Sequence, residues 1–139
     1  MVTCGKSPIW MASRANNQET IMAYVDGYVL PVPSARIDDY KRIARKAGKV
    51  WKEHGALAYV EAVADDVKPG KRTSFPQAVK LKEDEVVVFA YVLFRSRAHR
   101  DKVNAKAMAD PRLAGMGPQN MPFDGKRMFW GGFKPFVQL

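Results

Sequence analysis

Two carboxylates inside otherwise apolar, strand-like stretches are the residues best placed to do chemistry. Asp26 lies within residues 23–30, and Glu61 lies within residues 56–64. A carboxylate that aromatic side chains enclose is harder to ionise, so it can hold or take a proton near neutral pH. Arg127, in a later stretch of the same kind, can pair with either carboxylate and can offer an acidic ligand a bidentate contact. A structural role is the alternative, with Asp26 bonded to nearby backbone and Glu61 at a solvated edge.

His99 is a third candidate catalytic residue, because it occupies the third position of a predicted helix that Ser96 can cap. The helix dipole disfavours a charged imidazole there, and a neutral one beside Arg97 and Arg100 could act as a base. The same side chain lies one turn before Val103 and could equally be packed in the core. We favour the structural role, since this helix has no clean apolar stripe and several of its polar side chains must face inward or toward a partner.

Composition excludes several classes of chemistry. The chain has 139 residues, a formal net charge of +9 and a single cysteine, Cys4. It therefore cannot form a disulfide framework within one chain and suits a reducing, cytoplasmic setting. His54 and His99 have no second His or Cys close by, so we expect no metal site. The sequence has no phosphate-binding loop, no dinucleotide fingerprint, no Ser-His-Asp order and no run of about 18 apolar residues, so we expect no cofactor and no membrane contact.

Apolar periodicity predicts the elements that must position these residues. The uninterrupted apolar run over 86–94 is typical of a central strand that is buried on both faces. Pro31 and Pro33 are expected to end the first strand, and residues 73–81 are expected to pack as a lid-like turn. The predicted elements are a strand over 23–30, a helix over 34–54 ended by Gly55, strands over 56–64 and 86–94, a helix over 96–110 and a strand over 126–133.

This order of elements predicts the fold class. Strand, helix, strand, strand, helix, strand is the ferredoxin-like α+β arrangement, with a four-stranded antiparallel sheet whose helices cover one face. We expect residues 22–139 to form this single domain and residues 1–21 to be an irregular N-terminal extension. Met22 would be a sensible alternative start, and the extension is cloning sequence, an overlong gene start or a genuine arm.

The uncovered face of such a sheet is the central functional question. If the small aliphatic residues face the helices, the open face carries Tyr24, Asp26, Tyr28, Tyr59, Glu61, Phe89, Tyr91, Leu93, Arg127 and Phe129. A face with so many aromatic residues is costly to hydrate. One interpretation is a homodimer, in which two sheets close a barrel around a pocket for a small, partly aromatic or carboxylated molecule. The predicted pocket residues are Asp26, Tyr28, Glu61, Tyr91, Arg127 and Phe129, with His99 at the border.

The second interpretation is RNA binding. Residues 89–94 match the end of an RNA-recognition signature, in which alternate aromatic residues stack on bases. Val87 and Val88 occupy the positions where that signature requires a basic residue and a glycine. The predicted helices are basic, but Lys41 and Arg45 belong to a row typical of a solvated helix face. We therefore favour the homodimer over nucleic-acid binding.

Several motifs resemble those of a known family. The combination of residues 96–104 (SRAHRDKVN), 108–112 (MADPR) and 121–128 (MPFDGKRM) with 131–133 (GGF) resembles the YbaA-like bacterial family of unknown function. This resemblance implies a small bacterial protein with a dimeric α/β barrel fold and no established activity. Similar barrels include cofactor-free monooxygenases, isomerases and haem enzymes, which is an analogy of fold alone. A pocket with or without cofactor-free catalysis, an RNA-binding module and a purely structural dimer thus remain open.

Overall fold

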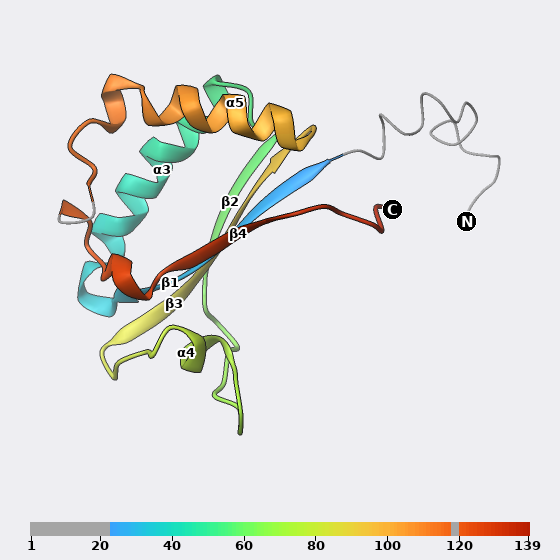
Figure 1. Cartoon of the computed structure of the whole chain (residues 1–139). Coiled ribbons are helices and arrows are strands. Elements are labelled where there is room, and N and C mark those ends of the chain that lie inside the picture. Colours follow the sequence, from blue (N-terminus) through green and yellow to red (C-terminus); the bar gives the residue numbers. More distant parts are fainter. Residues whose placement is uncertain (1–22, 118–119) are drawn as a thin grey trace.

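One antiparallel sheet of four strands forms the centre of the fold, and two long helices cover one of its faces (Figure 1). The computed structural model describes residues 23–117 and 120–139, so the extension expected over 1–21 lies outside the described residues. In chain order the elements are β1 (Tyr24–Pro33), the 3-10 turn η1 (Ser34–Arg36), α3 (Ile37–Glu53), β2 (Ala58–Val63), α4 (Phe75–Ala78), β3 (Glu85–Phe94), α5 (Arg97–Met108), the 3-10 turns η2 (Pro111–Leu113) and η4 (Gly125–Arg127), and β4 (Phe129–Phe133). The predicted ferredoxin-like α+β fold is confirmed.

The strands follow the order β2-β3-β1-β4, with β3 and β1 at the centre. β3 contains the apolar run that predicted a central strand, and it pairs with β1 along its whole length. β1 also runs through Pro31 and Pro33, which the sequence predicted to end it. These prolines are tolerated because β4 pairs with β1 only as far as Val29. Beyond Val29 one side of β1 has no ladder that requires N–H donors.

Local signals fix the ends of both long helices. The side-chain Oγ of Ser96 accepts a hydrogen bond from the backbone N of His99 at 3.1 Å, so Ser96 caps α5 as its position predicted. Gly55 follows α3 with a φ of +121°, a left-handed conformation that favours glycine at the end of a helix.

Among residues 23–117 and 120–139, none of the helices has the length and apolar character that crossing a membrane requires.

Residues 73–81, expected as a lid-like turn, contain the short helix α4. The Oγ of Ser74 accepts a hydrogen bond from the backbone N of Gln77 at 3.2 Å and so caps this helix. Phe75 then meets Phe89 of β3 edge to face, with ring centroids 6.2 Å apart. The turn therefore packs against one end of the sheet, on the face that the long helices leave uncovered.

The helix-covered face of the sheet carries larger and more polar side chains than the sequence predicted. It holds Tyr24, Asp26, Tyr28, Tyr59 and Glu61. Because opposite residues of an antiparallel pair share a face, these positions lie with Val92 and Phe94, which pack against α5. The prediction that these five side chains lie on the open face is therefore wrong. The prediction assumed that the strands supply small residues beneath the helices. The small residue is instead Gly48 of α3, where a Cβ would lie only 2.8 Å from the Tyr59 ring.

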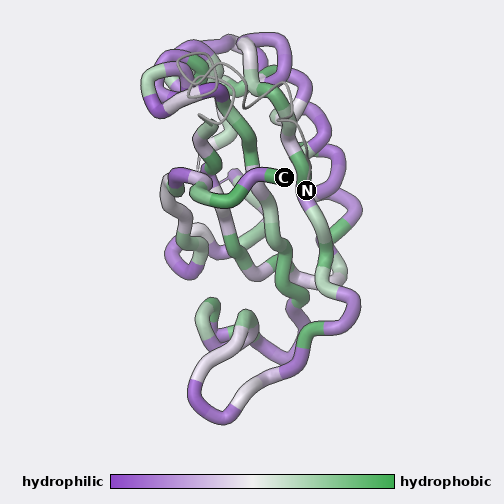
Figure 2. Tube along the Cα trace, turned by 90° about the vertical axis from the view of Figure 1, so that its right-hand side faces the viewer, coloured by the Kyte–Doolittle hydropathy of each residue, from purple (hydrophilic) through white to green (hydrophobic). Residues whose placement is uncertain are grey.

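The other face, which we call the open face, is largely apolar. It carries Val25, Gly27, Val29, Val60, Phe89, Tyr91, Leu93, Phe129 and Phe133. Phe89, Tyr91, Leu93 and Phe129 lie on this face as predicted. In Figure 2 the hydrophobic colour follows the strands, whereas the hydrophilic colour follows the outer turns of the helices. The charged strand residue of the open face is Glu85 at the start of β3, and the described strand positions of this face carry no Lys or Arg.

Candidate ligand-binding site

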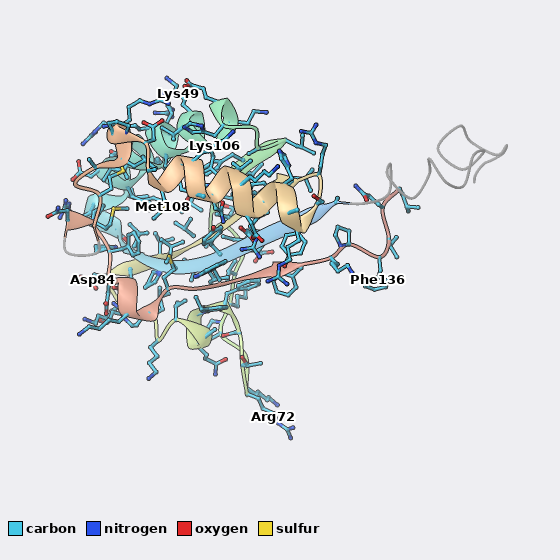
Figure 3. All side chains as sticks on the ribbon, turned by 45° about the horizontal axis from the view of Figure 1, so that its top comes forward. Lys49, Arg72, Asp84, Lys106, Met108 and Phe136 are labelled. Carbon is cyan, nitrogen blue, oxygen red and sulfur yellow. The ribbon has the colours of Figure 1, made fainter. Side chains whose placement is uncertain are left out.

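A cavity of about 880 Å³ lies between the helix-covered face of the sheet and α3. Its walls include Tyr28, Glu61, Ala90 and Val92 from the sheet, Tyr40, Ala44, Ala47 and Trp51 from α3, and Met108, Met116, Met121, Phe123 and Met128 from the end of α5 and the connection that follows. Figure 3 shows Met108 at the end of α5, where this third wall begins. Most of the lining is apolar, and Glu61 is the half-buried carboxylate within it.

Two tyrosine hydroxyls hold Glu61 in place. The hydroxyl of Tyr40 on α3 donates a hydrogen bond to Glu61 Oε1, and the hydroxyl of Tyr59 donates to Glu61 Oε2 at 2.6 Å. Burial raises the pKa of both tyrosines, and the negative charge of Glu61 raises it further. Both hydroxyls therefore keep their protons at ordinary pH and remain donors to Glu61. Each carboxylate oxygen retains a second lone pair for another donor.

Aromatic rings surround this carboxylate. The rings of Trp51 and Tyr59 lie with centroids 6.4 Å apart, and Tyr40 meets Phe123 edge to face at 5.7 Å. Tyr28 completes the group from β1 and stacks on Trp130, with centroids 5.8 Å apart. Burial, followed by the charge of Asp26, raises the pKa of Tyr28 to about 12, so this hydroxyl also stays protonated.

Asp26 belongs to a separate buried cluster beneath α5. Its side chain is 0% exposed, and Asn104 Nδ2 donates to Asp26 Oδ2 at 3.4 Å. Arg100 Nε lies 3.6 Å from Asp26 Oδ1, yet neither atom has a hydrogen-bond partner within the described residues. Trp51 Nε1 donates to Asn104 Oδ1 at 2.9 Å, which links the cluster to the wall of the cavity. Burial raises the pKa of Asp26, and the charge of Arg100 offsets only part of this rise.

Arg127 does not join Asp26, although the sequence predicted their pairing. It lies in η4, ahead of β4, because Asp124 accepts a hydrogen bond from the Lys126 backbone N and stabilises a turn where a strand was expected. The Arg127 guanidinium instead donates to both carboxylate oxygens of Glu85, at 2.7 and 2.6 Å, and to Asp124 at 2.9 Å. These contacts tie η4 to the start of β3. Arg100 is the cation beside Asp26.

His99 is held by its own helix terminus. Its Nδ1 accepts a hydrogen bond from the Arg95 backbone N at 3.0 Å, and its ring meets Phe94 edge to face at 6.0 Å. Burial, followed by the charge of Arg95, lowers the pKa of the imidazole. These contacts fit the structural role better than the catalytic one. His99 does not line the cavity.

The predicted ligand residues thus separate into groups. The cavity contains Tyr28 and Glu61, whereas Tyr91 and Phe129 lie on the open face of the same sheet. Asp26 lies in its own buried cluster, and Arg127 lies in η4, where it binds Glu85 and Asp124. The ligand-binding and catalytic roles of these residues stay predictions.

Sequence reasoning missed the aromatic residues from outside the sheet and the polar pair on α5. Tyr40, Trp51 and Phe123 appeared as core or connection residues, and only the folded chain places them around Glu61. The sequence could have shown that Arg100 and Asn104 lie side by side, because residues four apart share one face of a helix. Within the described residues, no group of three or more His, Cys, Asp or Glu side chains could hold a metal ion.

Comparison with known proteins identifies the family. The family described as "Protein of unknown function (DUF1428)" matches residues 23–125. The uncharacterized protein YbaA of Escherichia coli K12 is 48% identical over 116 residues, which cover 84% of this chain and 98% of the relative. Its counterpart in Shigella flexneri gives the same values. The predicted resemblance is confirmed, and the chain belongs to the DUF1428 family, whose function is unknown and which includes YbaA-like proteins.

Proposed function

We propose that this protein is a homodimer that binds a small, largely apolar molecule in the cavity beneath α3. The observation that supports the binding role is the cavity itself, at about 880 Å³ with a carboxylate fixed by two hydroxyls. Small-molecule sites are usually concave, mostly apolar and about 300–1,000 Å³ in volume, with a few convergent polar groups that orient the ligand. The cavity has this size and this chemistry.

The fixed geometry of Glu61 separates this cavity from an ordinary packing gap. A half-buried carboxylate is costly unless its oxygens are hydrogen-bonded. Tyr40 and Tyr59 meet this need from opposite walls, and both stay protonated donors. A bound molecule would therefore meet an oriented acceptor without reorganising the site, which lowers the cost of binding.

The open face supports the homodimer. Phe89 and Phe129 are 45% and 47% exposed in the single chain, and both lie on this largely apolar face. Phe136, in the segment after β4, is 97% exposed and lies far from the helices (Figure 3). So large an exposed apolar surface is costly to hydrate and typically marks an interface. The family resemblance implies a dimeric barrel, so the proposed occupant is a second copy of the chain.

RNA binding has weaker support. Aromatic residues are present on the open face, but its strand positions offer no Lys or Arg to neutralise phosphates. The basic side chains Lys49 and Lys106 lie on the helices, away from the open face (Figure 3). A surface that stacks bases needs cations beside its rings, so the arrangement favours apolar contact with another protein chain.

A thermal-shift screen with a chemically diverse compound library tests the binding role. Ala47→Trp fills the cavity from α3, so it should remove the stabilisation that any hit confers on the wild-type protein. Ala105→Trp places the same side chain on an exposed position of α5 and should leave that stabilisation unchanged. Hits that stabilise both variants equally would bind elsewhere, and a screen without hits would favour a purely structural dimer.

A further inference from the structure

The charge inside the cavity is opposite to that of the chain as a whole. The chain has a formal net charge of +9, but the half-buried charged side chain in the cavity wall is Glu61. Asp124 and Lys126 also border the cavity, but both are exposed and water screens them. The interior of the site therefore favours a cation.

The aromatic lining points to the same ligand charge. The rings of Tyr28, Tyr40, Trp51, Tyr59 and Phe123 all line the cavity. The face of an aromatic ring is electronegative, and a group of rings is the usual recognition site for ammonium groups that carry alkyl substituents. The Trp51 and Tyr59 ring planes are inclined at 43°, and those of Tyr40 and Phe123 at 80°. The group therefore presents both ring faces and ring edges.

Among the described residues, the buried part of this cavity offers an acidic ligand no free cation, since Lys126 lies at its exposed rim. The hydroxyls of Tyr40 and Tyr59 already donate to Glu61 and are not free to donate to an anion. The Arg127 guanidinium is held by Glu85 and Asp124, and Arg100 Nη2 donates to the Tyr24 hydroxyl at 3.2 Å. The sequence predicted a small, partly aromatic or carboxylated molecule, and these contacts argue against its carboxylated form.

The third wall suits the apolar part of such a ligand. Met108, Met116, Met121 and Met128 line this side of the cavity. Methionine is unbranched and polarizable, so it adapts to alkyl groups of different shapes and contacts aromatic rings favourably. The cavity therefore combines an apolar methionine wall with a carboxylate and aromatic rings.

Building on the proposed function, we propose that the cavity binds an alkylammonium compound. Its cationic nitrogen would lie near Glu61 among the aromatic rings, and its alkyl or aryl part would lie against the methionines. Glu61 would supply the ionic contact, and the rings would supply cation–π contacts.

Three compounds of similar shape and different charge test this assignment. Phenyltrimethylammonium carries the positive charge, tert-butylbenzene is its neutral isostere, and the carboxylate 4-tert-butylbenzoate carries a negative charge. Calorimetry or tryptophan fluorescence should show that the ammonium compound binds about tenfold more tightly than the neutral isostere, and that the anion binds more weakly than either. Equal or tighter binding of the neutral isostere would overturn the ammonium assignment and leave the cavity as a binding site.

Two variants locate the ionic contact. Glu61→Gln keeps an oxygen acceptor for one tyrosine and offers an N–H donor to the hydroxyl oxygen of the other. It should weaken binding of the ammonium compound by about tenfold, while affinity for the neutral isostere stays unchanged. Glu83→Gln removes the same charge from an exposed turn and should change neither affinity. Unchanged ammonium affinity in Glu61→Gln would contradict the assignment. If library hits depend on Ala47 but no ammonium compound binds, this inference fails and the proposed function stands.

Discussion

The helix-covered face and the open face belong to the same four strands, yet they carry different chemistry. The covered face holds Asp26, Glu61 and their tyrosine neighbours, whereas the open face holds mainly aliphatic and aromatic side chains, with Glu85 at one end paired to Arg127. Polar groups are thus enclosed where helices supply hydrogen-bond partners, and apolar groups remain exposed where no helix covers them. We therefore propose a small ligand for the covered face and a second protein chain for the open face.

The largest expected effect is on the open face. Tyr91→Glu would place a carboxylate in the middle of the proposed dimer interface, where an unpaired charge is strongly disfavoured. Sedimentation of the wild-type protein should give about twice the 15.6 kDa of one chain, and the variant should sediment as a single chain. The same change at exposed Ala105 should leave the dimer intact. A wild-type protein that is monomeric at micromolar concentration would contradict the proposed dimer.

The next effect concerns the buried cluster on the covered face. Arg100→Met would leave Asp26 buried without its cation, so the free energy of unfolding should fall by about 3 kcal/mol at neutral pH. Urea unfolding measures this loss. Arg97→Met, at an exposed position of the same helix, should change stability by less than about 0.5 kcal/mol. Adding Asp26→Asn to Arg100→Met should recover most of the loss, and no recovery would contradict the assigned pairing.

The pH dependence of Asp26 is a smaller effect with a defined sign. Its pKa is raised in the folded chain, so its contribution to stability is fully present below the ordinary pKa of 3.8 and is lost as pH rises through the folded value. Asp26→Asn avoids this loss, so the stability of the variant relative to wild type should increase from about pH 4 to about pH 7. Urea titrations across this range measure the slope.

Asp110 supplies a control of opposite sign. Hydrogen bonds from Arg112, with a smaller contribution from His54, hold the pKa of Asp110 well below its ordinary value. Its carboxylate therefore stabilises the fold above the ordinary pKa and loses this contribution as pH falls through the folded value. Relative to wild type, Asp110→Asn should become less stable as pH rises. The same slope for both variants would contradict the environment assigned to Asp26.

The smallest expected effect is RNA binding. Because the strands of the open face lack cations, any affinity should come from the helices, should not depend on sequence and should disappear at moderate salt. Fluorescence anisotropy with a labelled single-stranded RNA at low and high salt measures it. Tight binding that persists at high salt and disappears in Phe89→Ala would instead assign an RNA-recognition role to the open face.

Sequence pattern alone determined the order of the elements and the central position of β3. Nine consecutive apolar residues are typical of a strand flanked by other strands, so the central place of β3 followed from hydrophobicity. The predicted burial on both faces is wrong for the single chain, because Phe89 on the open face is 45% exposed. Ser96 and Gly55 marked helix ends because capping and left-handed backbone depend on the residue itself. The motifs over 96–133 likewise identified the family.

Only the tertiary structure decided which set of alternate strand residues faces the helices. Alternation divides a strand into two sets, but the choice between them depends on the surface of the helix that packs there. Gly48 leaves room for the Tyr59 ring, so the large residues of β2 face inward and bring Glu61 to Tyr40. Arg127 lies in a turn capped by Asp124 and not in the predicted strand. Arg100 pairs with Asp26, which is 74 residues away in the sequence, and no local pattern could reveal this contact.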